Sequence, residues 1–222
     1  MVEIILIRHA QASFGAADYD VLSELGHQQA RALGRVLKRQ GVEPDAVFTG
    51  AQRRHRETFE GLAEGLGLDP APVAVHEGLN EYDFKALLDA RFADTARPEG
   101  TDTDRRTHFR VLRETVLEWQ RDAIADPPER WAEFTARVHA ARDAMIGHGA
   151  ARVLAVSSGG AIAQMVADTL ETPPAQMIGM QLQMKNCAVT RLIAGRTTVY
   201  LHGFNETPHI DAETAPRLLT YS

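Results

Sequence analysis

Three separate stretches of the chain carry residues that could bind a phosphate group and react with it. Arg8 and His9 follow an apolar run at the N-terminus, Arg54 follows a second such run, and Ser158 and Gly159 follow a third. An arginine fork matches the oxygens of a phosphate and keeps its charge, and a glycine-opened helix start offers backbone N–H groups to an anion. A neutral imidazole can attack phosphorus at physiological pH. Together these residue types predict a phosphate site that contains its own nucleophile.

The positions of these residues support the interpretation more than their types do. The dipeptide Arg-His occurs again at Arg54-His55, so it is uninformative by itself. Each of the three stretches, however, comes directly after a strand-like run, and ligands of open α/β sheets bind beyond the carboxyl ends of the strands. We therefore expect the three stretches to meet at one edge of a sheet. The alternative role for His9 is that of a polar residue capping a strand end.

Strand-like and helix-like segments alternate along most of the chain. The expected elements, in chain order, are a strand over 2–7, a helix from 23 to 41, a strand over 45–49, a helix over 52–66, a strand over 73–75, helices over 104–124 and 131–146, a strand over 152–157, a helix over 159–170, and strands over 186–193 and 197–201. This order predicts a three-layer α/β/α sandwich whose central sheet is mostly parallel, with an antiparallel edge formed by the closing strand pair. Residues 1–222 are expected to form a single domain with a variable insertion at about 82–128.

Composition and charge restrict the expected partners and compartment. Hydrophobic residues make up 44% and charged residues 24% of the 222 residues, as in ordinary globular proteins. The net charge of −6 gives no basic surface for nucleic acid or for an anionic membrane. Cys187 is the single cysteine, which precludes an intramolecular disulfide, and the apolar N-terminal run is too short and too acidic for a signal peptide. We therefore expect a cytoplasmic protein without transmembrane segments.

Five segments resemble, in order, the motifs of the histidine phosphatase superfamily, the phosphoglycerate-mutase-like proteins. The opening motif of that family, a strand followed by Arg-His-Gly and Gln or Glu, is similar to Ile7-Arg8-His9-Ala10-Gln11. The family motif Ser-Ser-Pro-Leu-x-Arg-Ala-x-Gln-Thr aligns with residues 49–58, which begin Thr49-Gly50-Ala51-Gln52 and carry the arginine at Arg54. The remaining matches are Leu22–Ala30 for Leu-Thr-x-x-Gly-x-x-Gln-Ala, Leu79-Asn80-Glu81 for Leu-x-Glu, and Asn205–His209 for Asn-x-x-x-His.

The resemblance implies the fold of this family and a two-step hydrolysis of a phosphomonoester, with no cofactor and no metal. His9 would attack phosphorus and form a phosphohistidine, which water then hydrolyses. Arg8 and Arg54 would hold the phosphoryl oxygens and supply the positive charge that the transition state needs. Glu81 would protonate the leaving oxygen and then activate water. The implied substrate is a phosphorylated small molecule or a phosphoprotein, and a homodimer is left open.

The sequence departs from the family pattern at two sides of this site. The second family histidine, which follows a strand in the motif His-Gly-Gly, is replaced by Ser158, which is expected to line the phosphate pocket with Gly159. A neutral hydrogen bond contributes about 1 kcal/mol against about 1.5–3 kcal/mol for a charged one, so this exchange predicts turnover slowed about 10-fold. A Ser158→His substitution is accordingly expected to raise activity. Gly15 replaces an asparagine that many members carry, and Ala12 replaces a Ser or Thr, for which Ser13 is the candidate substitute.

A phosphatase is the leading functional hypothesis, and two alternatives remain. The first is a phosphate-binding regulatory protein with impaired catalysis, favoured by Ser158 and Gly15. The second, ranked lower, is a phosphoglycerate-type mutase, because residues 82–128 show no lid that would retain an intermediate.

Further residues are interpreted with less specific roles. Gln11, Ser13 and His209 are candidate pocket residues, and His209 has the alternative role of capping the last turn. The run Arg53–Arg56 is interpreted as a partly solvated helix start with one inward-facing member. Five cations of the insertion could recognise a second anionic group or be solvated surface charges, the second being favoured: Lys85, Arg91, Arg97, Arg105 and Arg106.

Overall fold

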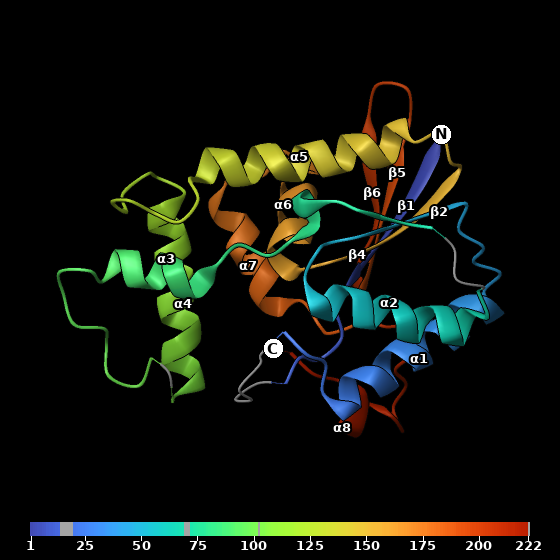
Figure 1. Cartoon of the computed structure of the whole chain (residues 1–222), viewed down its shortest axis with the longest axis horizontal. Coiled ribbons are helices and arrows are strands. Elements are labelled where there is room, and N and C mark those ends of the chain that lie inside the picture. The colour runs from blue at the N-terminus through green and yellow to red at the C-terminus, as the bar shows by residue number, and fades with distance from the viewer. Residues whose placement is uncertain (14–19, 69–71, 102, 222) are drawn as a thin grey trace.

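A six-stranded sheet with the order β3-β2-β4-β1-β5-β6 forms the centre of the protein (Figure 1). The computed structural model describes residues 1–13, 20–68, 72–101 and 103–221. The strands are β1 (Val2–Arg8), β2 (Ala46–Thr49), β3 (Val73–Val75), β4 (Arg152–Ser157), β5 (Val189–Ala194) and β6 (Val199–Glu206). Within these ranges no helix is long and apolar enough to cross a membrane.

Strand pairing confirms the predicted mixed sheet and explains how the chemistry-bearing residues come together. β1 pairs in parallel with β4, and β2 pairs in parallel with both β4 and β3. β5 runs antiparallel to β1 and to β6, and these two strands form the predicted antiparallel edge. The register sets Arg8 opposite Ser157 and Thr49 opposite Val156. The carboxyl ends of β1, β2 and β4 therefore lie side by side, at the end of the sheet where these parallel strands finish.

Helices cover both faces of the sheet, which gives the predicted three-layer α/β/α sandwich. Alternate residues of β1 divide between two buried clusters, with Ile5 and Ile7 in one and Ile4 and Leu6 in the other. The first cluster packs against α1 (Glu24–Arg39) and α2 (Arg53–Leu66). The second packs against α5 (Trp131–Gly147), α6 (Gly159–Thr169) and α7 (Ala175–Gln183). Burial on both faces explains why β1 and β4 appear as continuous apolar runs rather than alternating ones.

Local capping residues begin and end the helices that carry site residues. The Ser23 hydroxyl accepts the backbone N–H of Gly26 at 3.0 Å and caps α1, as predicted. Gly67 ends α2 with φ +71°, a left-handed conformation that glycine adopts without steric cost. The predicted helix over 104–124 is shorter in the structure, because α4 (Arg105–Trp119) ends before Asp122, whose φ is +53°.

The insertion contains a helix pair that extends the molecule beyond the sheet. α3 (Phe84–Arg91), which periodicity did not predict, packs on α4, and α4 packs on α7. Figure 1 shows α3 and α4 in green at the end of the molecule away from β6. The remaining short elements are the 3₁₀ helix η1 (Glu77–Leu79) and α8 (Ala215–Leu218).

The asparagine of the last predicted motif lies within a strand, because β6 continues to Glu206 rather than ending near residue 201. Asn205 has a φ of +55°, and its Oδ1 accepts the backbone N–H of Lys185 at 2.8 Å. Its Nδ2 donates to the carbonyl of Gln183 at 2.9 Å. Asn205 thus ties the antiparallel edge of the sheet to the end of α7, which contributes residues to the cavity described next.

Candidate active site

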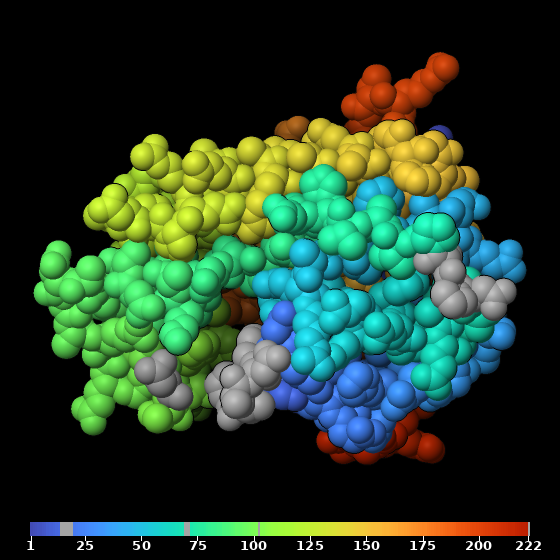
Figure 2. Space-filling model, viewed as in Figure 1, coloured from blue at the N-terminus to red at the C-terminus, as the bar shows by residue number. Residues whose placement is uncertain are grey.

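A cavity of about 410 Å³ opens at the carboxyl ends of β1, β2 and β4. Figure 2 shows the surface hollowed between the green segment of α3 and α4 and the blue and cyan segments of the N-terminal part. Its lining residues are Arg8, His9, Gln52, Arg54, Glu81, Tyr82, Asp83, Phe84, Lys85, His108, Phe109, Leu112, Gln181, Leu182 and Tyr221. The structure therefore brings together Arg8, His9, Arg54 and Glu81, which come from three separate stretches of the sequence.

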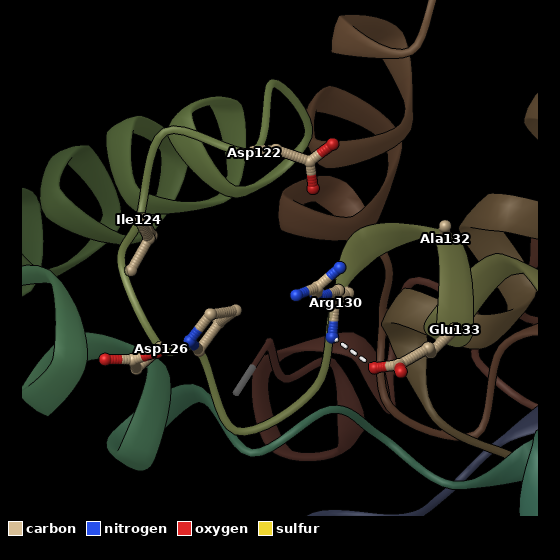
Figure 3. Close-up of a pocket in the computed structure, with 7 residues that line it drawn as sticks. Asp122, Ile124, Asp126, Arg130, Ala132 and Glu133 are labelled. Atoms are coloured by element: carbon tan, nitrogen blue, oxygen red, sulfur yellow. Dashed lines mark hydrogen bonds between the residues drawn. The ribbon is translucent and has the colours of Figure 1, made fainter.

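A larger cavity, of about 680 Å³, lies between the loop after α4 and the start of α5 (Figure 3). Its charged lining residues are Asp122, Asp126, Arg130 and Glu133. The backbone N–H of Arg130 donates to the Glu133 carboxylate at 2.8 Å, a contact that caps α5. A phosphate site with a nucleophile requires several cations around an imidazole or similar group, and the described lining residues of this second cavity do not provide them.

His9 is held in the tautomer that a nucleophile needs. Its Nδ1 lies 2.8 Å from the carbonyl of Ala10, so Nδ1 carries the proton and donates it, and Nε2 keeps its lone pair. The residue is only 4% exposed, and this burial, followed by Arg54, Arg8 and His55, holds the pKa of His9 well below its ordinary value. His9 is therefore neutral near pH 7. A buried neutral imidazole flanked by guanidinium groups can attack an electrophilic phosphorus atom.

The Arg54 guanidinium is fixed by two neighbours that the sequence analysis did not identify. Its Nη1 donates to Asp20 Oδ1 at 2.6 Å, and its Nη2 donates to Gln52 Oε1 at 2.8 Å. Arg54 lies at the start of α2, whereas Arg53 pairs with the buried Glu57 and Arg56 pairs with the exposed Glu60 of the same helix. Arg54, and not either neighbour, is the arginine that the structure places in the cavity.

Arg8 is packed against the start of α6. Its Nη1 donates to the carbonyl of Met184, which follows α7. A Cβ on Gly159 would lie 3.5 Å from Arg8 Nε, so the backbone of the glycine-opened helix approaches the guanidinium group closely. Arg8 and Gly159 are thus neighbours at the start of α6, but Gly159 is not among the described residues that line the cavity.

The Glu81 carboxyl is in an environment suited to carrying a proton. It accepts backbone N–H groups from Gly160 at 3.0 Å and from Tyr82 at 3.3 Å. Burial raises the pKa of Glu81, although these N–H groups and the two arginines oppose the rise. A Cβ on Gly160 would lie 2.1 Å from Glu81 Oε1, so only glycine leaves room for the carboxyl at this place. A carboxyl with a raised pKa keeps its proton to higher pH than an ordinary glutamate and is able to act as a general acid.

Ser158 lies behind the cavity wall rather than in it. It is fully buried at the start of α6, and its Oγ lies 2.7 Å from Nε2 of His55 and 3.4 Å from Oε1 of the lining residue Gln52. His55 is also fully buried, and its ring centroid lies 5.9 Å from that of His9. Burial, followed by the charge of Arg54, lowers the pKa of His55 to about 3.

The interpretation of residues 53–56 as having one inward-facing member is wrong. Arg54 and His55 are both buried, because the first turn of α2 sits against the ends of β2 and β4. Arg54 extends into the cavity, and His55 extends toward the end of β4. Two consecutive helix residues can both be buried where a helix end is enclosed on more than one side.

Three candidate pocket residues are not among the described residues that line the cavity. The Gln11 side chain accepts the Ser23 hydroxyl at 2.8 Å, which commits it to the start of α1. The Ser13 backbone N–H donates to the carbonyl of Val21, and the side chain is not in the cavity wall. His209 is buried after β6, at the antiparallel edge of the sheet. Gly15 lies outside the described residues.

Of the five cations of the insertion, Lys85 lines the cavity. Arg91 pairs with Glu118 at 2.7 Å, and Arg97 pairs with Asp89. Arg105 stacks on the ring of Phe109 at 5.3 Å. Arg91 and Arg97 therefore have structural partners within the insertion. In the described parts of the chain, no group of three or more His, Cys, Asp or Glu side chains is arranged to hold a metal ion.

Comparisons with known proteins identify a family and several relatives that this chain resembles. The family model described as "Histidine phosphatase superfamily (branch 1)" matches residues 4–207. A 2,3-bisphosphoglycerate-dependent phosphoglycerate mutase of Sphingopyxis alaskensis is 33% identical over 135 residues, which are 58% of this chain and 54% of the mutase. The chain spans little more than half the length of the curated relatives it matches.

Two solved structures resemble the whole fold. The Bacillus stearothermophilus protein YhfR superposes with a TM-score of 0.69 at 21% identity, covering 95% of this chain and 100% of that one. A mycobacterial glucosyl-3-phosphoglycerate phosphatase, solved with inorganic phosphate, superposes with a TM-score of 0.66 at 22% identity, covering 95% and 100% of the two chains. At this level of identity the likeness establishes the fold.

Proposed function

This chain belongs to the histidine phosphatase superfamily (branch 1), and on that premise we propose that it hydrolyses phosphomonoesters through a phosphohistidine formed at His9. One observation carries the proposal. A neutral His9, whose Nδ1 donates to Ala10 and whose Nε2 therefore keeps its lone pair, lines one cavity together with Arg8, Arg54 and Glu81. A nucleophile, two cations for the phosphoryl oxygens and one acid–base group are the parts that a two-step phosphoryl transfer requires.

The proposed reaction has two balanced steps. In the first, Nε2 of His9 forms a bond to phosphorus while the bond to the alcohol oxygen breaks, and the Glu81 proton moves to that oxygen. In the second, the Glu81 carboxylate takes a proton from water, the water oxygen attacks phosphorus, and the P–N bond breaks. Arg8 and Arg54 offset the negative charge on the phosphoryl oxygens in both steps. Inorganic phosphate leaves, and His9 and Glu81 return to their starting states.

The test is a measurement of product from several phosphomonoesters, including p-nitrophenyl phosphate and phosphoglycerate. We expect release of inorganic phosphate, inhibition by vanadate and a transient acid-labile phosphoenzyme. Isomerised phosphoglycerate without free phosphate would instead support a mutase. Binding of phosphate or vanadate by calorimetry, with neither turnover nor labelled protein, would support the catalytically impaired binding protein and would contradict the proposal.

The wall of the cavity supports a substrate whose alcohol has an apolar body. The same wall contains Phe84, Phe109, Leu112 and Leu182, which come from α3, α4 and α7. A volume of about 410 Å³ lies in the range of small-molecule pockets. A substrate that uses both parts of this wall carries a phosphoryl group and an apolar surface.

We expect kcat/KM for primary n-alkyl phosphates to rise with chain length until the cavity is filled. These substrates all release a primary alcohol, so the increase in kcat/KM reports the burial of apolar surface. Each buried methylene contributes about 0.8 kcal/mol, or up to about fourfold in kcat/KM. Phe109→Ala should flatten the series, whereas Leu170→Ala, at an exposed position after α6, should leave its slope unchanged. A series that is flat in the wild-type protein would exclude an apolar substrate body.

A further inference from the structure

The proposed reaction leaves one buried histidine of the site without a task. His55 lies with its Nε2 2.7 Å from the Ser158 hydroxyl and its ring 5.9 Å from that of the proposed nucleophile His9. It comes from the start of α2, whereas Ser158 follows β4 and precedes the first residue of α6. Burying an imidazole is costly unless it makes compensating hydrogen bonds. A fully buried histidine next to the reacting groups therefore requires an explanation.

Gly50 provides the space that this imidazole occupies. A Cβ on residue 50 would lie 2.1 Å from Nδ1 of His55, which is closer than nonbonded atoms approach. A side chain at 50 and a histidine at 55 therefore exclude each other. In the family motifs that these segments resemble, positions 50, 55 and 158 hold Ser, Ala and His, and here they hold Gly, His and Ser. The three departures are in contact, because Gly50 leaves room for the His55 ring and that ring hydrogen-bonds Ser158.

The hydrogen bonds of His55 indicate its tautomer. Nδ1 has no hydrogen-bond partner among the described residues and faces Gly50. A buried N–H without an acceptor is more costly than a bare ring nitrogen with room beside it, so Nε2 carries the proton. Nε2–H then donates to Ser158 Oγ, and the hydroxyl hydrogen of Ser158 is left to donate elsewhere. Its described acceptor is Gln52 Oε1, at 3.4 Å.

Gln52 connects this pair to the proposed phosphate site. Its Oε1 also accepts hydrogen bonds from Arg54 Nη2 at 2.8 Å and from the backbone N–H of Glu81 at 3.1 Å. One amide oxygen is thus shared by the buried Ser158, by a phosphate-binding arginine and by the segment of the acid–base residue. Chains of hydrogen bonds of this kind fix the orientation of every member.

We propose that His55 and Ser158 act as a positioning pair that replaces the histidine absent at 158, with His55 orienting the Ser158 hydroxyl and, through Gln52, the Arg54 guanidinium and the segment of Glu81. The proposal rests on the proposed function. The pair is neutral, so it supplies orientation without adding positive charge beside His9. Neither member forms a bond to substrate in this role.

With His55 in this place, Ser158→His is no longer expected to raise activity, although the sequence alone predicts an increase. An imidazole at 158 would overlap with His55, because Ser158 Oγ and His55 Nε2 are already in hydrogen-bond contact. Ser158→His alone is therefore expected to lower activity. Combined with His55→Ala, which vacates that space, it is expected to recover at least 10-fold over Ser158→His alone, on the order of one lost hydrogen bond and the removed overlap.

The test is a double-mutant cycle of His55→Leu and Ser158→Ala, read as kcat and KM for p-nitrophenyl phosphate. Each single variant should lower kcat on the order of 10-fold. The kcat of the double variant should be no lower than that of the less active single variant, because both substitutions break the same chain of hydrogen bonds. His55→Gln, whose side-chain N–H can reach the same hydroxyl, should recover most of kcat. His139→Leu is the matched control, since it removes a 2.6 Å histidine hydrogen bond to Asp168 outside the cavity and should leave kcat unchanged.

Multiplicative losses in the double variant, absence of rescue by His55→Gln, or higher activity of Ser158→His while His55 is present would each overturn the pair. If His55→Leu does not fold, His55→Ala takes its place in the same cycle. If the wild-type protein releases no phosphate from any ester, the proposed function fails, and the cycle is then read as the Kd of vanadate. Coupled losses of affinity would still support the pair, and independent ones would reject it.

Discussion

Replacing His9 with alanine is expected to lower kcat/KM by at least about 10⁴-fold, or about 5.5 kcal/mol of transition-state stabilisation. The substitution removes the atom that forms the covalent bond in the proposed first step, and no other described side chain in the cavity is a neutral imidazole with its Nε2 free and both arginines near. Phosphate binding should persist, because Arg8 and Arg54 remain. Steady-state kinetics and calorimetry with phosphate measure the two effects separately.

The control for this substitution is His148→Ala. His148 is exposed after α5, where its ring contacts Phe48 edge-on, and it does not line the cavity. It should retain wild-type kinetics and should still form labelled phosphoenzyme, whereas His9→Ala should form none. Label that persists in His9→Ala would place the nucleophile elsewhere. A joint loss of turnover and of phosphate binding would indicate that the substitution damaged the fold.

The fold could be predicted largely from sequence because its central strands have an unambiguous pattern. β1 and β4 are buried on both faces, so their apolar residues form continuous runs that end at Arg8 and Ser157. Since parallel strands end at the same edge, the meeting of Arg8, His9 and Arg54 followed from the element order. α7 was missed because it buries little, with Met177 and Ile178 as its described buried residues, and a short helix with two buried positions shows no clear period.

The parts of the site that sequence did not reveal depend on contacts between elements. His55 has the appearance of one polar residue in a charged run, and its burial is possible only because Gly50 and Ser158, from the ends of two strands, leave room for it. Gln52 and Asp20 are likewise identified by what they contact, namely the Arg54 guanidinium. Local sequence patterns predict which strand ends come together. They do not predict which neighbouring side chains hydrogen-bond the residues at those strand ends and hold them in position.

The pKa shifts of the two proposed reacting groups predict which group limits activity at each end of the pH range. His9 must be neutral to attack, and its pKa is held well below 6.5, so activity should fall only as the pH drops through that low pKa. Glu81 must be protonated to act as the acid, and its pKa is raised from 4.5, so activity should fall as the pH rises through the raised pKa. The activity window is bounded below by His9 and above by Glu81.

Glu81→Gln is expected to affect alkyl phosphates and p-nitrophenyl phosphate differently in the first step, because only the alkyl leaving group needs a proton. An alkoxide leaves poorly without a proton, so kcat/KM for alkyl phosphates should fall by about 10²- to 10⁴-fold. p-Nitrophenolate leaves without protonation, so its kcat/KM should fall by no more than about 10-fold. The second step still lacks its base, and the phosphohistidine should accumulate, giving a burst of nitrophenol equal to the enzyme concentration in stopped-flow traces.

The burst distinguishes Glu81 as an acid–base group from Glu81 as a structural residue. A carboxyl that only anchors the N-terminus of α6 through the N–H of Gly160 would lower kcat/KM equally for both classes of ester when replaced. Equal losses without a burst would thus reject the proposed role. Glu77→Gln, an exposed glutamate of η1 four residues earlier, should keep wild-type kinetics and the alkaline loss of activity, whereas Glu81→Gln should lose that limb of the pH profile.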